Sequence, residues 1–292
     1  MSPNLLPVLG YGTNGFTDHT LNDMLDVVAG YGYEAIALTL GHPHFDPFAD
    51  EWERRARELR SALHERGMRV VVETGARYLL DPYVKHHPTL VDREASRRLT
   101  FLARAIEIAG VLDADCVSLW SGVTPDDVTS DEAWSMLVER MADVVALASV
   151  RGVQLGFEPE PGMRVETVAD ALALREELGN PDRLGITVDL GHCVAVEPGG
   201  VVDALRSAGD LLVNVQVDDM MPGVHEHLEL GTGQLDLALA FRTLSEIGYD
   251  GVAAIELPRH SHAAPRLARE SMERMREALN AASESTTTRK SL

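Results

Sequence analysis

Acidic side chains collect where four apolar, strand-like runs end in the second half of the chain. The runs read GFEPEP, VDLGH, VNVQVDD and AAIEL. Their polar end residues are Glu158, Glu160, Asp189, His192, Gln216, Asp218, Asp219 and Glu256. Several carboxylates in one small volume repel one another unless a cation lies among them. If the four runs end at one place, the sequence predicts a cation site there.

The elements that carry these groups alternate regularly from one end of the chain to the other. Apolar runs predict strands at 8–12, 34–40, 69–75, 116–122, 154–161, 185–192, 212–219 and 252–258. Amphipathic stretches predict helices at 17–31, 50–67, 91–112, 130–151, 166–178, 198–208, 237–247 and 263–281. The second of these places Leu59, Ala62 and Leu63 on one face and has Gly67 as a stop signal.

Eight strand-then-helix units without a linker predict one α/β domain, a (β/α)8 TIM barrel over residues 1–281. Residues 282–292 are expected to form a disordered tail. The alternative is an open doubly wound sheet. It would be favoured by a phosphate-binding glycine loop after the first strand, but GYGTNG (10–15) lacks the full dinucleotide spacing. In a barrel, the active site lies at the C-terminal ends of the strands.

The composition of the chain limits the kinds of partner that it is expected to bind. The chain has 292 residues and a formal net charge of −20, which disfavours nucleic acid and anionic membranes as partners. There is no apolar run of about 20 residues, so we expect no membrane span and a cytoplasmic protein. Cys116 and Cys193 lie in or beside apolar runs and are expected to be packed thiols.

Four motifs, in their order and spacing, resemble the xylose-isomerase-like barrel superfamily of sugar and sugar-phosphate isomerases and epimerases. They are GFEPEPG (156–162), VDLGH (188–192), LGTGQLD (230–236) and EIGYDGVAAIEL (246–257). The resemblance covers roughly residues 5–280. The same superfamily contains inosose dehydratase, dehydroshikimate dehydratase and endonuclease IV.

The resemblance implies a metal site with one ligand from each of the last four strands: Glu158, Asp189, Gln216 and Glu256. Relatives most often carry histidine on the seventh strand, and the dehydratase branches resemble this chain in placing glutamine there. An amide oxygen beside three carboxylates suits Mn²⁺ or Mg²⁺, with Zn²⁺ or Co²⁺ as alternatives.

The resemblance also implies a reaction. Glu158 and Glu256 would be the acid/base pair of a metal-dependent isomerase or epimerase that acts on a sugar, sugar phosphate or cyclitol through an enediolate. The side chains expected to contact this small carbohydrate are His192, His227, Glu160 and Arg259. Metal ligation is the second interpretation for His227. Arg77, Lys85 and Arg259 are cations that a phosphate or carboxylate of the substrate would need.

Several alternatives stay open. A carbon-oxygen lyase of the dehydratase type is the main rival and is favoured by Gln216. Endonuclease-like action is disfavoured by the net charge, and a non-catalytic ligand-binding barrel by the presence of both Glu158 and Glu256. Glu73 either lines the pocket or makes a local hydrogen bond, and His225 is expected to be solvated. Barrels of this group often pair, so a homo-oligomer is a further alternative.

Overall fold

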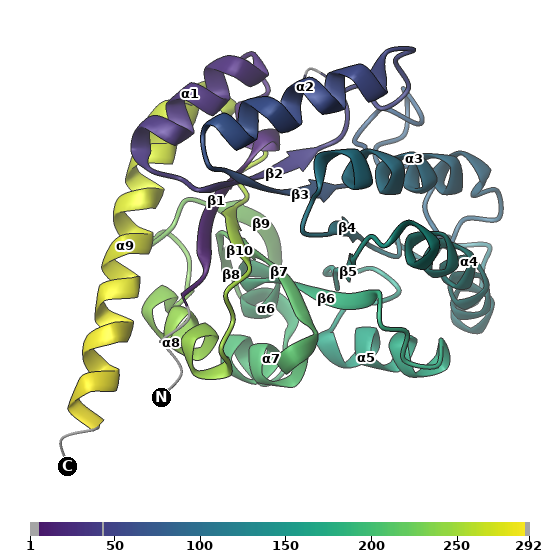
Figure 1. Ribbon diagram of the computed structural model, residues 1–292. Helices are drawn as coiled ribbons and strands as arrows, with labels where there is room; N and C mark the ends of the chain where they lie inside the picture. The colour runs from purple at the N-terminus through teal and green to yellow at the C-terminus, as the bar shows by residue number, and fades with distance from the viewer. Residues whose placement is uncertain (1–5, 43, 290–292) are drawn as a thin grey trace.

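The fold is a closed barrel of eight parallel strands surrounded by helices (Figure 1). The computed structural model describes residues 6–42 and 44–289, with side chains described as far as residue 282. Around the barrel the strand order is β1-β10-β7-β6-β5-β4-β3-β2. The barrel strands are β1 (Val8–Gly12), β2 (Ala35–Thr39), β3 (Arg69–Glu73), β4 (Val117–Leu119), β5 (Leu155–Phe157), β6 (Leu184–Asp189), β7 (Leu212–Val217) and β10 (Val252–Ile255).

The outer layer consists of helices whose apolar faces pack on the barrel. They are α1 (Leu21–Tyr31), α2 (Trp52–Glu65), α3 (Ser96–Leu112), α4 (Ser130–Arg151), α5 (Val168–Glu177), α6 (Leu190–Val196), α7 (Gly200–Ala208), α8 (Leu237–Ile247) and α9 (Ala264–Arg289). Local signals set their ends. Thr129 and Glu132 form a capping box that starts α4, and Gly152, at φ 68°, ends it. None of the helices in the described part of the chain is long and apolar enough to cross a membrane.

The register of the strands places their polar ends at one level. Thr39 of β2 pairs with Glu73 of β3. Asp189 of β6 pairs with Gln216 of β7, which in turn pairs with Ala254 of β10. Because parallel strands of a barrel all end at the same face, these pairings bring residues far apart in the sequence to one rim.

The predicted fold class and all eight predicted strands are confirmed; the first keeps its predicted bounds and the other seven are shorter than predicted. The fifth strand ends at Phe157, because Pro159 and Pro161 lack the N–H that a strand ladder needs. The sixth ends at Asp189, whose side chain caps α6, a helix that the sequence did not predict. Also unpredicted is the antiparallel hairpin of β8 (Asp219–Met221) and β9 (Val224–Leu228). Both cysteines are buried thiols, as expected.

The C-terminal helix is longer than predicted. The sequence places its end at residue 281, whereas α9 continues to Arg289 and extends along one side of the barrel (Figure 1). Residues 290–292 lie outside the described residues. The disorder of the tail 282–292 in solution stays a prediction.

Candidate active site

A pocket of about 270 Å³ opens at the C-terminal ends of the strands. It is lined by residues from both halves of the chain, and the predicted site residues among them are Glu158, Glu160, His192, Gln216, His227, Glu256 and Arg259. Asp189 is not a lining residue, since it is only 1% exposed. Its carboxylate nevertheless has an oxygen within 4.8 Å of ligand atoms of Glu158 and His192, and within the same distance of His227 and Glu256. The structure therefore brings the whole predicted set together.

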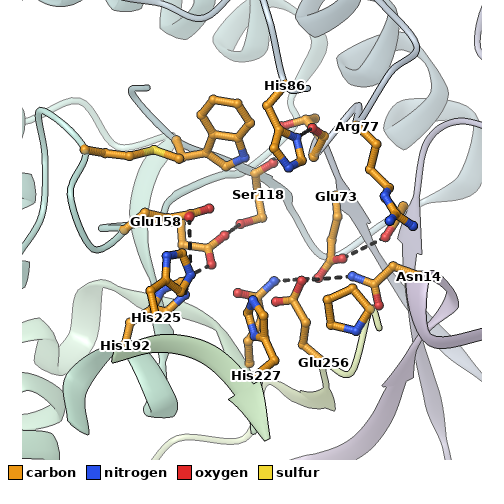
Figure 2. A pocket seen from close by; sticks show the side chains of 18 of the residues that line it. Asn14, Glu73, Arg77, His86, Ser118, Glu158, His192, His225, His227 and Glu256 are labelled. Atoms are coloured by element: carbon orange, nitrogen blue, oxygen red, sulfur yellow. Dashed lines mark hydrogen bonds and ion pairs between the residues drawn. The ribbon is translucent and has the colours of Figure 1, made fainter. Parts of the chain in front are cut away.

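Glu158 and Glu256 lie across the pocket from each other, each held by one hydrogen bond (Figure 2). Glu158 follows β5 and accepts a hydrogen bond of 3.1 Å from the hydroxyl of Ser118. Glu256 follows β10 and accepts one of 2.9 Å from the side-chain amide of Asn14, a residue just after β1. These two bonds could not be predicted from the sequence, because each joins residues that are distant along the chain.

Asp189 lies near both glutamates, and only one of its two carboxylate oxygens accepts a hydrogen bond. Its Oδ1 accepts the backbone N–H of His192 at 2.7 Å, which starts α6. Its Oδ2 is buried and has no hydrogen-bond partner among the described residues. A buried carboxylate oxygen without a donor is costly in a folded protein, so this atom is available to a ligand.

The side-chain amide of Gln216 likewise has one bonded and one unbonded polar atom. Its Nε2 donates to Glu73 Oε1 at 2.8 Å, while Glu73 Oε2 accepts a bond of 3.0 Å from Thr39. The buried Oε1 of Gln216 finds no partner in the described part of the chain. Glu73, for which the sequence left two interpretations, thus lines the pocket and fixes the amide of Gln216 with its oxygen free.

Three imidazoles gather on the neighbouring side of the pocket. His227 Nδ1 donates to Asp218 at 2.6 Å, and His192 Nε2 lies 3.1 Å from His225 Nε2. Ring nitrogens of the three histidines lie within 4.8 Å of one another. The carboxylate of Asp218 fixes the tautomer of His227 and leaves its Nε2 lone pair free to accept a hydrogen bond or bind a metal.

His225 is exposed to solvent, as expected, but it also lines the pocket, because β9 places residues two apart on the same face. The H-x-H spacing in HEHLEL would have identified it, had the hairpin been predicted. Burial lowers the pKa of His225 to about 4 and also lowers that of His192, so both rings are neutral at neutral pH.

The pocket carboxylates repel one another strongly. Burial, followed by the neighbouring acids, raises the pKa of Glu158 and Glu256 well above the ordinary value. Burial likewise raises the pKa of Glu160 to about 7 and that of Asp218 well above its usual range. Such mutual repulsion is relieved by a cation.

The donor atoms fit a divalent cation. The free Oδ2 of Asp189 and the free Oε1 of Gln216 are oxygen donors, as are the carboxylates of Glu158 and Glu256. A set of oxygen ligands with no thiolate suits Mn²⁺ or Mg²⁺, and the adjacent imidazoles also suit Zn²⁺ or Co²⁺. Asp219 has a different role: it accepts three backbone N–H bonds, from Met220, Gly231 and Leu235, and so fixes the hairpin.

Comparison with known proteins identifies the family of the chain. A family model for the xylose isomerase-like TIM barrel matches residues 25–278. A 2-oxo-tetronate isomerase of Cupriavidus necator is 27% identical over 241 residues, covering 81% of this chain and 86% of the relative. An L-ribulose-5-phosphate 3-epimerase of Salmonella paratyphi A is 27% identical over 232 residues, covering 76% and 80%.

Solved structures agree on the fold. A structure of L-ribulose 3-epimerase covers 97% of this chain, and 98% of its own length is matched, with a TM-score of 0.78 at 18% identity. The two sequence relatives are named as an isomerase and an epimerase, the class of enzyme that the motifs predicted. The chain belongs to the xylose isomerase-like TIM barrel family, as an enzyme of the isomerase and epimerase type.

Proposed function

We propose that this protein is a divalent-metal-dependent isomerase or epimerase of a small sugar or sugar derivative, in which Glu158 and Glu256 exchange protons with the substrate. One observation carries the proposal. Two glutamates face each other across a pocket, each oriented by a neutral donor, and the free oxygens of Asp189 and Gln216 lie in the same cluster. The names of the two relatives, which act on an oxo-tetronate and on a ketose phosphate, support a short keto sugar as substrate.

The metal ligands in this proposal are Glu158, Asp189, Gln216 and Glu256. A divalent cation held by them would polarise the substrate carbonyl, stabilise the charge that develops on its oxygen, and keep both glutamates ionised. His227, with its free Nε2, is close enough to Asp189 and Glu256 to bind either the cation or a substrate hydroxyl.

The two glutamates account for both reactions. One carboxylate removes a proton from the carbon beside the carbonyl, giving an enediolate. In an epimerase, the other carboxylate returns a proton to the opposite face of the same carbon. In an isomerase, the proton is returned to the adjacent carbon. The hydrogen bonds from Ser118 and Asn14 orient the glutamates for these transfers.

Proton exchange tests the proposal directly. The purified protein, loaded with Mn²⁺, is incubated in D₂O with a panel of ketoses, ketose phosphates and oxo sugar acids, and deuterium incorporation is followed by NMR. We expect exchange beside the carbonyl of at least one compound, together with about one divalent ion per chain by elemental analysis. Absence of bound metal, and of any stabilisation on adding Mn²⁺, Mg²⁺, Co²⁺ or Zn²⁺, would contradict the proposal.

A second candidate, a dehydratase of cyclitols or related keto compounds, is favoured by Gln216 at the seventh strand. In that case the enediolate expels a β-hydroxyl group instead of regaining a proton. Appearance of an ultraviolet-absorbing enone, with loss of water from the product mass, would replace the first candidate by this one.

A further inference from the structure

The pocket is also lined by cations. Arg77, Lys85 and Arg259 are all lining residues, in a protein whose net charge is −20. Lys85 is one of two lysines in the chain, the other being Lys290. Arg259 forms an ion pair with Glu226 at 3.3 Å on the rim. Within the described residues, the side chains of Arg77 and Lys85 form no ion pair and no hydrogen bond.

The loop that carries Arg77 and Lys85 is held in place by a buried arginine. Residues 74–95 connect β3 to α3. Arg98, which is 2% exposed, donates to the backbone carbonyls of Thr74, His86 and Pro88 at 2.8–2.9 Å. Its guanidinium lies 4.5 Å from the ring centroid of Trp120. The segment between these carbonyls therefore has a fixed position over the pocket.

The backbone of the loop brings its two cations to the same place. The N–H of His86 bonds the carbonyl of Arg77 at 2.6 Å, which closes residues 77–86 into a loop and places Lys85 near Arg77. Ala76 and Arg77 have φ of 60° and 38°, a region that side chains rarely adopt. Backbone strain of this kind is typical of functional positions. In Figure 2, Arg77 extends into the pocket on the side of Glu73 and Asn14.

Lys85, Arg77 and Arg259 are close enough to repel one another. Partial burial lowers the pKa of Lys85, and the charges of Arg77 and Arg259 lower it further, while Glu160 acts in the opposite direction. The nearby imidazole does not add to the charge, because burial lowers the pKa of His86 to about 4. Cations gathered on one side of a pocket, with free N–H donors, are stabilised by an anion placed between them.

We propose that Arg77 and Lys85, with Arg259 at the rim, form a subsite for an oxyanion group of the substrate. The substrate is then an anionic sugar, a sugar phosphate or a sugar acid, whose charged end lies on the loop side while its carbonyl end faces Glu158 and Glu256. A pocket of about 270 Å³ is at the small end for ligand sites and favours a single short sugar. The position of the carbonyl end rests on the proposed function; the oxyanion subsite does not.

Affinity for charged and neutral probes, measured instead of reaction rate, tests the subsite separately from the proposed reaction. Calorimetry on the metal-loaded protein compares D-xylulose, D-xylulose 5-phosphate and L-threonate as probes. We expect at least one charged probe to bind about tenfold tighter than the neutral sugar, and most of this gain to be lost in Arg77→Met and in Lys85→Met. Arg206→Met, which removes a guanidinium from the outside of α7, is the matched control and leaves the gain unchanged.

A second readout separates the subsite from a bound metal, which also attracts phosphate. Reductive ¹³C-methylation labels both lysines and keeps their charge. In the metal-free protein, inorganic phosphate is expected to shift the Lys85 signal, assigned by its loss in Lys85→Arg, and to leave the Lys290 signal in place. Circular dichroism of the methionine variants confirms that they are folded.

The outcomes are distinct. Preference for the phosphorylated probe or for the sugar acid supports the subsite and identifies which oxyanion it takes. Equal affinity for charged and neutral probes, with no shift of the Lys85 signal, overturns the subsite, and the proposed function survives if neutral ketoses exchange protons. Charged probes that bind through Lys85 while no compound of the panel exchanges protons support the subsite and count against the proposed function.

Discussion

The acidic side of the pocket is carried by strand ends, whereas its cationic side is carried by loops. Glu158, Asp189 and Gln216 are 4%, 1% and 3% exposed and are fixed by barrel register and short hydrogen bonds. Arg77 and Lys85 are exposed, and their positions depend on the contacts that hold residues 74–95 in place. Under the proposed function the two sides would have separate roles: the strand ends would transfer the proton, and the loop would select the substrate.

Removing either glutamate carboxylate should abolish most of the activity that we attribute to the acidic side of the pocket. In Glu158→Gln and Glu256→Gln the shape is kept but the acid/base group is lost, so we expect kcat/KM to fall by about 10²–10⁴-fold. Proton exchange in D₂O measures the effect. Glu246→Gln, on the surface of α8, is the control. Full activity in both pocket variants would refute the assignment of the acid/base pair.

Arg98→Met should make the loop that carries Arg77 and Lys85 less ordered and should leave the geometry of the pocket acids unchanged. The change leaves three backbone carbonyls without their donor, and we expect a loss of about 2–4 kcal/mol in the free energy of unfolding. Urea denaturation measures it. Affinity for the charged probe should fall while the affinity for Mn²⁺ is kept. An equal loss of both would show that the two sides are not independent.

Glu73→Met tests how the amide of Gln216 is oriented. Without Glu73 the amide can rotate, and its oxygen no longer points at the cation, so affinity for Mn²⁺ should fall by about 10–100-fold. Titration with competition by a chelator measures it. Glu73→Gln can still accept the hydrogen bond and should retain most of the affinity. Unchanged affinity in Glu73→Met would remove Gln216 from the ligand set.

The smallest expected effect is the pH dependence of the metal-free protein. A carboxyl whose folded pKa is raised, such as Glu160 at about 7 against the ordinary 4.5, costs stability as pH rises from 4.5 towards its folded pKa, and the loss is complete once pH exceeds that pKa. His192 and His225 have lowered pKa values, so their contribution to stability increases with pH, but only below about pH 6.5. From pH 6.5 to 8.5, stability should therefore fall by at least about 1 kcal/mol.

Thermal unfolding across that pH range measures the slope. Added Mn²⁺ should remove most of it, because a cation among the acids stabilises their ionised forms. A metal-free protein whose stability is constant or rises from pH 6.5 to 8.5 would show that the acids do not repel one another as described.

The sequence was sufficient for the acidic side because strand ends are encoded locally. Apolar runs, each followed by a polar residue, place Glu158, Asp189 and Glu256 at strand ends, and the resemblance to the xylose-isomerase-like barrels implies their use as ligands. The sequence was not sufficient for Glu73, since its role depends on a bond to Gln216, 143 positions away along the chain. The hairpin that directs His225 into the pocket was also missed, because β8 is only three residues long.

The loop side was the least predictable part. Arg98 lies on a helix whose pattern would place a charged residue at the surface, yet it is buried under the loop it holds. Nothing in the order of residues 74–95 indicates that three of their carbonyls meet one guanidinium.

The attachment of residues 74–95 through arginines of two neighbouring helices has a consequence for how substrate range can change. Residues 74–95 could be exchanged for the corresponding segment of another family member as one unit, provided that Arg97, Arg98 and Arg140 are kept and the new segment presents carbonyls to them. The reaction centre would not have to be rebuilt, because its ligands come from other strands. New substrates could thus be acquired, in natural divergence or by directed evolution, through one short stretch of sequence.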